Sequence, residues 1–135
     1  MSLELEIILR LLLAAVFGMA IGYQREHVGK PAGLRTHALV CLGAALFTIV
    51  SVYGFKSSLV DPSRVAAGVV AGVGFLGAGV IFRGFRGDRV AGLTTAASIW
   101  ATAAVGLAAG VGMYLISFIA AVICVALLMA PKVRG

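Results

Sequence analysis

Residues 61–82 read DPSRVAAGVVAGVGFLGAGVIF and decide the class of fold. Asp61 can accept from free backbone N–H groups at a helix start, and Pro62 suits the first helical position because it loses no needed donor. No charged residue occurs after Arg64 as far as Phe82, and this length crosses a hydrocarbon core of about 30 Å when it is helical. The stretch therefore predicts a transmembrane helix.

Glycines remove side-chain bulk from this helix at close intervals, at Gly68, Gly72, Gly74, Gly77 and Gly79. In water each glycine would weaken a helix by about 1 kcal/mol relative to alanine. In lipid the backbone has no water to bond to, and small residues let neighbouring helices approach closely. We expect this segment to be the central packing helix of a membrane bundle.

The same glycines contain a pattern found in dinucleotide-binding loops, because Gly72, Gly74 and Gly77 spell G-x-G-x-x-G. That fingerprint requires a preceding strand, a helix that opens at the glycines, and an acidic residue about twenty positions later. Here the glycines lie deep inside an apolar segment, and no acid occurs around Ala97. We therefore interpret them as packing residues and expect no nucleotide cofactor.

The composition excludes a soluble domain. Of the 135 residues, 61% are hydrophobic and only 12% are charged, and the mean hydropathy is +1.10. A soluble domain of this size could not bury so much apolar surface. The net charge of +6 is typical of nucleic-acid binding in soluble proteins. In a membrane protein it indicates orientation and contact with anionic lipid, so we expect no nucleic-acid partner.

Four further apolar segments accompany the glycine-rich one, at about residues 3–23, 38–55, 90–109 and 113–130. The sequence thus predicts an all-α, polytopic membrane protein with a bundle of about five transmembrane helices. A very short connection near Val111 predicts a tight hairpin of the last two helices.

Two of these segments carry GxxxG pairs, which favour close helix packing: Gly18 with Gly22, and Gly106 with Gly110. In the first segment, Glu6 and Arg10 stand one helical turn apart and can form an ion pair. Two interpretations of that pair are open. It either reaches toward the headgroups at the membrane boundary or lines a polar path between helices.

The charged residues predict the orientation of the chain. One side of the predicted bundle collects Arg25, Lys30, Arg35, Arg83, Arg86, Arg89, Lys132 and Arg134, whereas the other has Lys56 and Arg64. By the positive-inside rule the crowded side is cytoplasmic, so the N-terminus is expected outside and the C-terminus inside.

Enzymatic chemistry fits the sequence poorly. His27 and His37 are the only histidines, and neither belongs to an evident constellation with a nucleophile. No CxxC motif or histidine cluster accompanies Cys41 and Cys124, so nothing points to a disulfide framework or a zinc site. We expect no catalytic residues and no cofactor.

Three long stretches resemble the MgtC/SapB family: KPAGLRTHALVCLGAALF at 30–47, DPSRVAAGVVAGVGFLGAGVIFR at 61–83 and GLTTAASIWATAAVGLAAG at 92–110. The resemblance covers nearly the whole chain and implies a five-helix domain in a bacterial inner membrane. Some members carry a further cytoplasmic domain after it. The chain stops just after the fifth span, so we expect a single transmembrane domain over 1–135 without that soluble domain.

Family motif positions fall on Arg25, Gly33, Leu34, Arg35, Thr36, Gly72, Gly74, Phe75, Gly77, Gly79, Arg83, Gly92, Thr94, Thr95 and Trp100. Three positions depart from the pattern. Gln24 stands where the family usually has a glutamate, Gly68 where it often has a glutamine, and Ala101 where some members have a cysteine. The first departure speaks against a carboxylate-based mechanism at that position.

The resemblance implies a role in adaptation to low magnesium and, in intracellular pathogens, in virulence. Two classes of function stay open: a regulatory or interaction protein, which we favour, and a magnesium or other cation transporter. Magnesium prefers an octahedral shell of oxygens, yet no acidic residue falls in the middle of a predicted span. GxxxG surfaces favour a homodimer or contact with another membrane protein, for which the ATP synthase is the first candidate.

We expect the functional residues in a polar cluster on the cytoplasmic side, formed by Arg25, Glu26, Arg35, Thr36, Arg83, Thr94 and Thr95. Within it, Arg25 and Glu26 are expected to form a buried ion pair with Arg35 nearby. The alternative is a solvated loop network of little energetic weight. Threonines and serines of the fourth segment, Thr94, Thr95, Ser98 and Thr102, can also share one helix face as a polar seam. The identity of any metal ligand is left open.

Overall fold

The computed structural model describes residues 2–55, 57–84 and 92–131. Five helices account for most of them: α1 (Leu3–His27), α2 (Leu34–Tyr53), α3 (Ser63–Gly84), α4 (Leu93–Gly110) and α5 (Tyr114–Met129). The described part of the chain contains no strand, and the predicted all-α class is confirmed. In that part, α1 to α4 are long and apolar enough to cross a membrane, and α5 is a shorter apolar helix of 16 residues.

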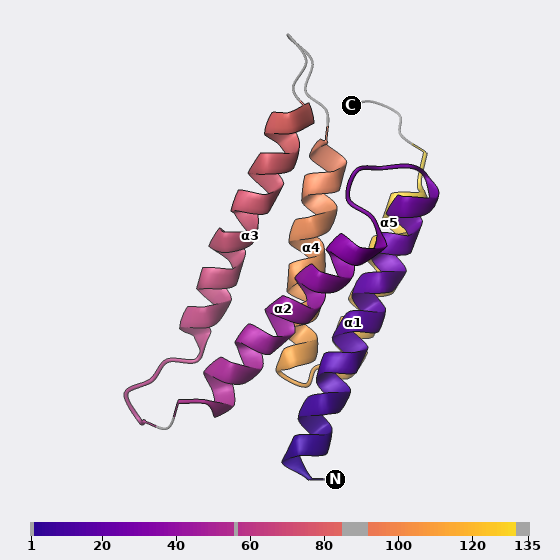
Figure 1. The fold of residues 1–135 in the computed structure, drawn as a ribbon. Coiled ribbons are helices and arrows are strands. Elements are labelled where there is room, and N and C mark those ends of the chain that lie inside the picture. Colours follow the sequence, from indigo (N-terminus) through magenta and orange to yellow (C-terminus); the bar gives the residue numbers. More distant parts are fainter. Residues whose placement is uncertain (1, 56, 85–91, 132–135) are drawn as a thin grey trace.

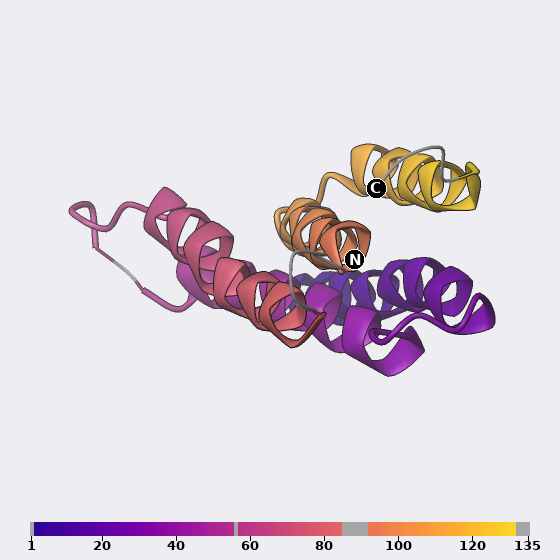
Figure 2. The same ribbon diagram turned by 90° about the horizontal axis from the view of Figure 1, so that it is seen from above.

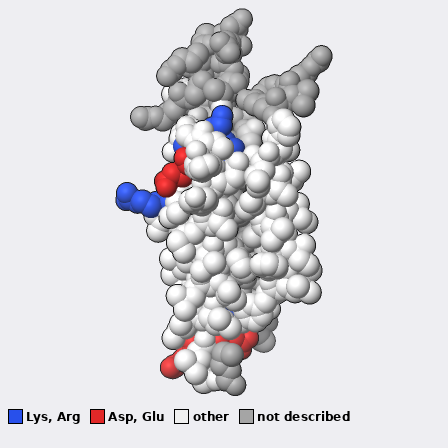
Figure 3. Space-filling view, turned by 90° about the vertical axis from the view of Figure 1, so that its right-hand side faces the viewer, with Lys and Arg blue, Asp and Glu red and all other residues white. Residues whose placement is uncertain are grey.

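Successive helices run in opposite directions (Figure 1). Helix α1 begins at the lower end of the bundle in that view, and α5 ends at the upper end. The upper end therefore holds the last turns of α1, α3 and α5 together with the first turns of α2 and α4. Figure 3 shows charged side chains at both ends of one face, with a broad uncharged middle between them. This distribution suits a bundle whose middle lies in the hydrocarbon core.

The start of α3 follows the predicted capping chemistry. The Asp61 carboxylate accepts hydrogen bonds from the backbone N–H of Ser63 at 2.9 Å and from its hydroxyl at 2.7 Å. These bonds hold the pKa of the Asp61 carboxyl below its usual value. The helix itself begins at Ser63, one residue after the Pro62 position that the sequence suggested.

The centre of the bundle is α4, and this corrects the expectation that the glycine-rich helix occupies it. Helix α4 contacts all four other helices, and 56% of its span is buried, against 6% of the span of α3. Helix α3 packs mainly on α4 at one edge of the protomer (Figures 1 and 2). Helix α3 can be apolar and yet lie at the edge, because lipid surrounds the bundle and an apolar face exposed to lipid costs nothing.

Most glycines of α3 consequently have no neighbour within the protomer. A Cβ added at Gly68, Gly72, Gly74 or Gly79 would meet nothing within 4 Å, and one at Gly77 would make ordinary contact with Ala96. The packing role expected of this glycine series is thus confined, inside one protomer, to Gly77.

The two GxxxG pairs both lie against α2. A Cβ on Gly18 would come within 2.7 Å of Cys41 Cβ, and one on Gly22 within 2.6 Å of the Gly33 carbonyl oxygen. On the other side, a Cβ on Gly106 would collide with the carbonyl oxygen of Cys41. Helix α2 therefore packs at backbone distance on both α1 and α4, which also contact each other, and only glycines leave room for it.

The main core lies where these helices meet α5. Its fully or nearly fully buried members come from four helices: Ala14, Phe17, Ile21, Cys41, Ala45, Val105, Ala109 and Ala121. Alanines dominate because the helix axes are close, so larger side chains would not fit between them. A smaller cluster of Ala44, Val69 and Ala103 joins α3 to α2 and α4.

Candidate functional site

A buried polar network occupies the upper end of the bundle. Arg25, in the last turn of α1, is only 4% exposed. Its Nη2 donates a hydrogen bond of 3.0 Å to Oγ1 of Thr95, which lies in the first turn of α4. This bond joins two helices whose residues stand 70 positions apart. It brings together two of the residues that the sequence proposed for the site.

His37 of α2 extends the network and has no exposed surface. Its Nδ1 lies 2.9 Å from the Gly33 carbonyl oxygen, and its Nε2 lies 2.8 Å from Oγ of Ser98. A carbonyl oxygen only accepts, so Nδ1 carries the hydrogen, and in the neutral ring Nε2 accepts from Ser98. The network therefore links α1, α2 and α4 through side chains.

The Ser98 hydroxyl has two acceptors within reach for its one hydrogen. The carbonyl oxygen of Thr95 lies 2.7 Å away, in addition to the ring nitrogen of His37. If His37 gains a proton, Nε2 becomes a donor, and the Ser98 hydrogen is free to bond the Thr95 carbonyl. The arrangement can thus take up a proton without moving a heavy atom.

The other polar side chains of α4 and α1 bond within the bundle as well. Thr102 donates to the Ser98 carbonyl at 2.6 Å, so this member of the predicted polar seam satisfies its own helix. Gln24 donates from Nε2 to the Leu128 carbonyl oxygen of α5 at 2.9 Å. Two buried atoms at this end have no hydrogen-bond partner, Oε1 of Gln24 and Nε of Arg25.

Four of the other residues of the predicted cluster do not join the network. Glu26, Arg35, Thr36 and Thr94 are exposed, and the side chain of Arg83 lies outside the described residues. The expected buried ion pair of Arg25 and Glu26 is wrong: within the described residues the one salt bridge joins Arg10 and Glu6. Consecutive helical positions point about 100° apart, so a buried Arg25 places Glu26 on a different face.

A second polar cluster, at the lower end, surrounds Arg10. This side chain is 6% exposed and donates to Glu6 at 2.7 Å, to the Gly110 carbonyl at 3.0 Å and to the Tyr114 hydroxyl at 3.4 Å. Its guanidinium also lies 5.6 Å from the ring centre of Tyr53. The predicted Glu6–Arg10 pair is confirmed, and its role is to join α1 to the other helices rather than to reach outward.

The turn after α4 is shaped around this arginine. Gly112 has a φ of +88°, a left-handed conformation that suits glycine. A Cβ there would also lie 3.0 Å from Nη2 of Arg10. The tight hairpin of α4 and α5 therefore depends on glycine for both its backbone and its contact with the buried cation.

Sequence reasoning found no constellation around His37 and missed its bond to Ser98. The spacing of Thr95, Ser98 and Thr102 on one helix face was visible, and it is the face that α4 buries. Nothing in the sequence pairs this face with His37, because the two lie on separate helices.

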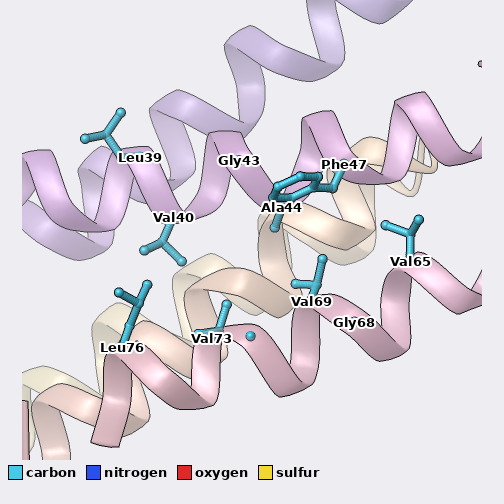
Figure 4. A pocket seen from close by; sticks show the side chains of 11 residues that line it. Leu39, Val40, Gly43, Ala44, Phe47, Val65, Gly68, Val69, Val73 and Leu76 are labelled. Carbon is cyan, nitrogen blue, oxygen red and sulfur yellow. The ribbon is translucent and has the colours of Figure 1, made fainter. Parts of the chain in front are cut away.

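An apolar groove lies between α2 and α3 and has a volume of about 640 Å³. Leu39 and Phe47 of α2 line one side, and Val73 and Leu76 of α3 line the other (Figure 4). None of the lining side chains is polar. The groove can hold lipid chains or apolar side chains, but it offers nothing to bind an ion.

A family model of the MgtC family matches residues 11–133. The chain belongs to the MgtC family. The chain is 56% identical over 115 residues to YhiD of Escherichia coli K12, which is named as a candidate magnesium transporter. The match covers 81% of this chain and 53% of YhiD. The network of Arg25, His37, Thr95 and Ser98 thus lies within the family's matched region.

Two other MgtC-family relatives are SapB of Bacillus subtilis and MgtC of Salmonella typhimurium. SapB is 44% identical over 115 residues, with 81% of this chain and 49% of SapB covered. MgtC of strain LT2 is 47% identical over 107 residues, with 79% of this chain and 44% of MgtC covered. The chain thus spans about half the length of these relatives. No solved structure matches it.

Proposed function

We propose that this MgtC-family protein is a regulatory or interaction protein of a bacterial inner membrane, active in magnesium homeostasis and in low-magnesium or virulence-related adaptation. The family membership and the relatives named for magnesium transport or MgtC support the link to magnesium. The regulatory role is our own inference, and it is carried by the charges inside the bundle.

Both permanently charged side chains that are buried in the described residues are arginines, Arg10 near the lower end and Arg25 near the upper end. A magnesium ion that passed through the protomer would meet a cation near each end and be repelled by both. Magnesium also needs several oxygen ligands. The acid nearest to the interior, Glu6, already pairs with Arg10 at 2.7 Å.

The exposed face of α3 supports an interaction role. Gly72 and Gly74 leave its backbone open to a neighbouring helix, and Phe75 beside them is 86% exposed. Small residues next to a large apolar one suit close packing by another transmembrane helix. A second copy of this chain or another membrane protein, with the ATP synthase as the first to test, is the proposed occupant.

The second candidate function is transport of magnesium or another cation. The observation that favours it is the printed name of YhiD, the relative that is 56% identical. A path for the ion would then have to avoid Arg10 and Arg25, for example by running between protomers.

The deciding experiment is a magnesium flux assay in proteoliposomes with a trapped dye and an imposed gradient. We expect no flux above protein-free vesicles. Arg25→Ala and Thr95→Val run alongside as matched variants of one hydrogen bond. Flux that both variants lower would establish transport and overturn the regulatory proposal.

A second experiment addresses the partner. ATP synthase from the same host membrane is co-purified with the wild-type protein and with Gly74→Leu, at a position where an added Cβ would meet nothing within 4 Å and which does not line the groove between α2 and α3. We expect the variant to recover less ATP synthase, or less homodimer, than the wild-type protein does. Equal recovery of both species with wild type and variant would remove α3 as the interaction surface.

A further inference from the structure

The guanidinium of Arg25 is buried without a counter-charge among the described residues. Only 4% of the surface of Arg25 is exposed. The one salt bridge among the described residues joins Arg10 to Glu6 and does not involve Arg25. Within the described ranges, Nε of Arg25 has no hydrogen-bond partner. A buried, uncompensated cation is costly at the end of a membrane bundle, so a negative group is expected near it.

Arg25 is directed at the start of helix α4, which is the electrostatically unfavourable end of a helix for a cation. Its Nη2 donates to Oγ1 of Thr95, in the first turn of the 18-residue helix α4. The start of a helix carries a partial positive charge and free N–H donors, and it favours anions. Two positive groups therefore face each other with only a threonine hydroxyl between them.

Among the residues that the structure describes, no side chain caps the start of α4. Its N-cap residue is Gly92, with a φ of +86° and no side chain that could accept from the first N–H groups. Serine, threonine, aspartate or asparagine usually fills this position. The start of α4 and the guanidinium of Arg25, whose Nε is unpartnered in the described part of the chain, thus meet at Thr95, and the neighbouring Thr94 is exposed.

Helix α2 provides a comparison at the same end of the bundle (Figure 1). Its N-cap is also a glycine, Gly33, without a side-chain cap. There, however, a carboxylate is supplied: a Cβ on Gly33 would lie 2.7 Å from Oε1 of Glu26. The start of α2 has an acid beside it, whereas the start of α4 has an arginine.

We propose that Arg25 and the first turn of α4 form a binding site for a phosphate-type oxyanion. Guanidinium groups bind phosphate through forked hydrogen bonds, and helix starts bind it through backbone N–H groups. The site lies where the spans end, so the phosphate belongs either to an anionic phospholipid headgroup or to a free phosphate compound. The site is defined by these residues alone and holds whether the protein regulates or transports.

The test measures thermal unfolding of the purified full chain in detergent. One arm adds dioleoyl phosphatidylglycerol, with dioleoyl phosphatidylcholine as its neutral control. The other adds sodium phosphate, with sodium chloride at equal ionic strength. At a hundredfold excess over Kd we expect Tm to rise by about 5 °C or more. A rise with phosphatidylglycerol alone identifies the lipid headgroup, and a rise with sodium phosphate identifies the free anion.

Arg25→Gln and Arg35→Gln are the matched variants, because each removes one positive charge at the same end and Arg35 is exposed. The rise in Tm should disappear in Arg25→Gln and persist in Arg35→Gln. An equal loss in both variants would show diffuse charge attraction and would overturn the site. No rise in the wild-type protein with either phosphate source would overturn it as well.

A second variant covers the case in which Arg25→Gln does not fold. Thr94→Glu places a carboxylate in the first turn of α4 and leaves Arg25 intact, with Thr94→Gln as its uncharged control. We expect Thr94→Glu to raise Tm without ligand and to abolish the response to phosphate, because the built-in anion occupies the site. A Thr94→Glu protein that still responds like Thr94→Gln would contradict the proposal.

Discussion

His37 and Ser98 stand 61 residues apart and meet at 2.8 Å inside the bundle. Neither residue belongs to a sequence motif. The role of each is seen only in the structure, where the two side chains share a hydrogen bond. In lipid a buried polar group finds no water, so such pairs must form between helices. At the scale of single residues, this bond and the one between Arg25 and Thr95 specify how α4 is rotated against α1 and α2.

Replacement of Ser98 by alanine tests how much the hydrogen bond between His37 and Ser98 stabilises the bundle. Ser98→Ala leaves Nε2 of His37 without a partner in a fully buried position. We expect a loss of about 1 kcal/mol in the free energy of unfolding, measured by thermal unfolding in detergent. Thr94→Val, at an exposed position of the same helix, should change stability far less. Equal effects of the two variants would show that the His37 bond contributes nothing.

At the scale of elements, helix α2 depends on glycines of its neighbours. Gly18 of α1 and Gly106 of α4 both lie against Cys41. Each GxxxG pair indicated close packing from the sequence, but neither indicated the partner helix. By the same pattern α3 was expected at the centre, yet of its glycines from Gly68 to Gly79 only Gly77 would bring an added Cβ within 4 Å of another residue. A glycine series in the sequence shows that another helix can approach closely, but it does not show which helix does so.

Matched glycine-to-alanine variants separate the two kinds of position. Gly106→Ala places a methyl group against the Cys41 carbonyl, and we expect overpacking to cost about 1–3 kcal/mol. Gly74→Ala has open space and should leave the protomer as stable as the wild type or slightly more stable, because alanine favours the helix. Chemical unfolding in detergent measures both. A Gly74→Ala protein as unstable as Gly106→Ala would place a neighbour on α3 even in detergent.

At the scale of the whole molecule, the upper end gathers the last turn of α1 and the first turns of α2 and α4 (Figure 1). Arg25, Lys30 and Arg35 lie in this part of the chain. The lower end carries Arg10 and Arg64 among the described residues, together with the acids Glu4, Glu6 and Asp61. This asymmetry is the physical basis for placing the upper end in the cytoplasm.

Cysteine labelling tests that orientation. In a background with Cys41→Ala and Cys124→Ala, exposed positions at the two ends are replaced in turn, as Lys30→Cys and Ser58→Cys. A membrane-impermeant maleimide added to intact cells should label Ser58→Cys and reach Lys30→Cys only after permeabilisation. The reverse pattern would invert the proposed topology, and labelling of both positions in intact cells would show a mixed orientation.

The sequence by itself determined the class of this protein. Long apolar segments can be stable only in lipid, and lipid demands helices, so the count and the alternating direction of the helices followed from composition and length. The boundaries were predicted less well, because α1 continues to His27 and α2 already begins at Leu34. The Glu6–Arg10 pair was also predictable, because both partners lie one turn apart on one helix. Family membership followed from long motifs that cover most of the chain.

Only the tertiary structure decided which helix is central and which polar residues meet. Membrane helices lack the amphipathic pattern that marks the inner face of a soluble helix, since both lipid and protein interior accept apolar side chains. Nothing in the sequence therefore distinguished the edge position of α3 from the central position of α4. For the same reason Arg25 was paired with its sequence neighbour Glu26, whereas packing turned it inward to Thr95 on a distant helix.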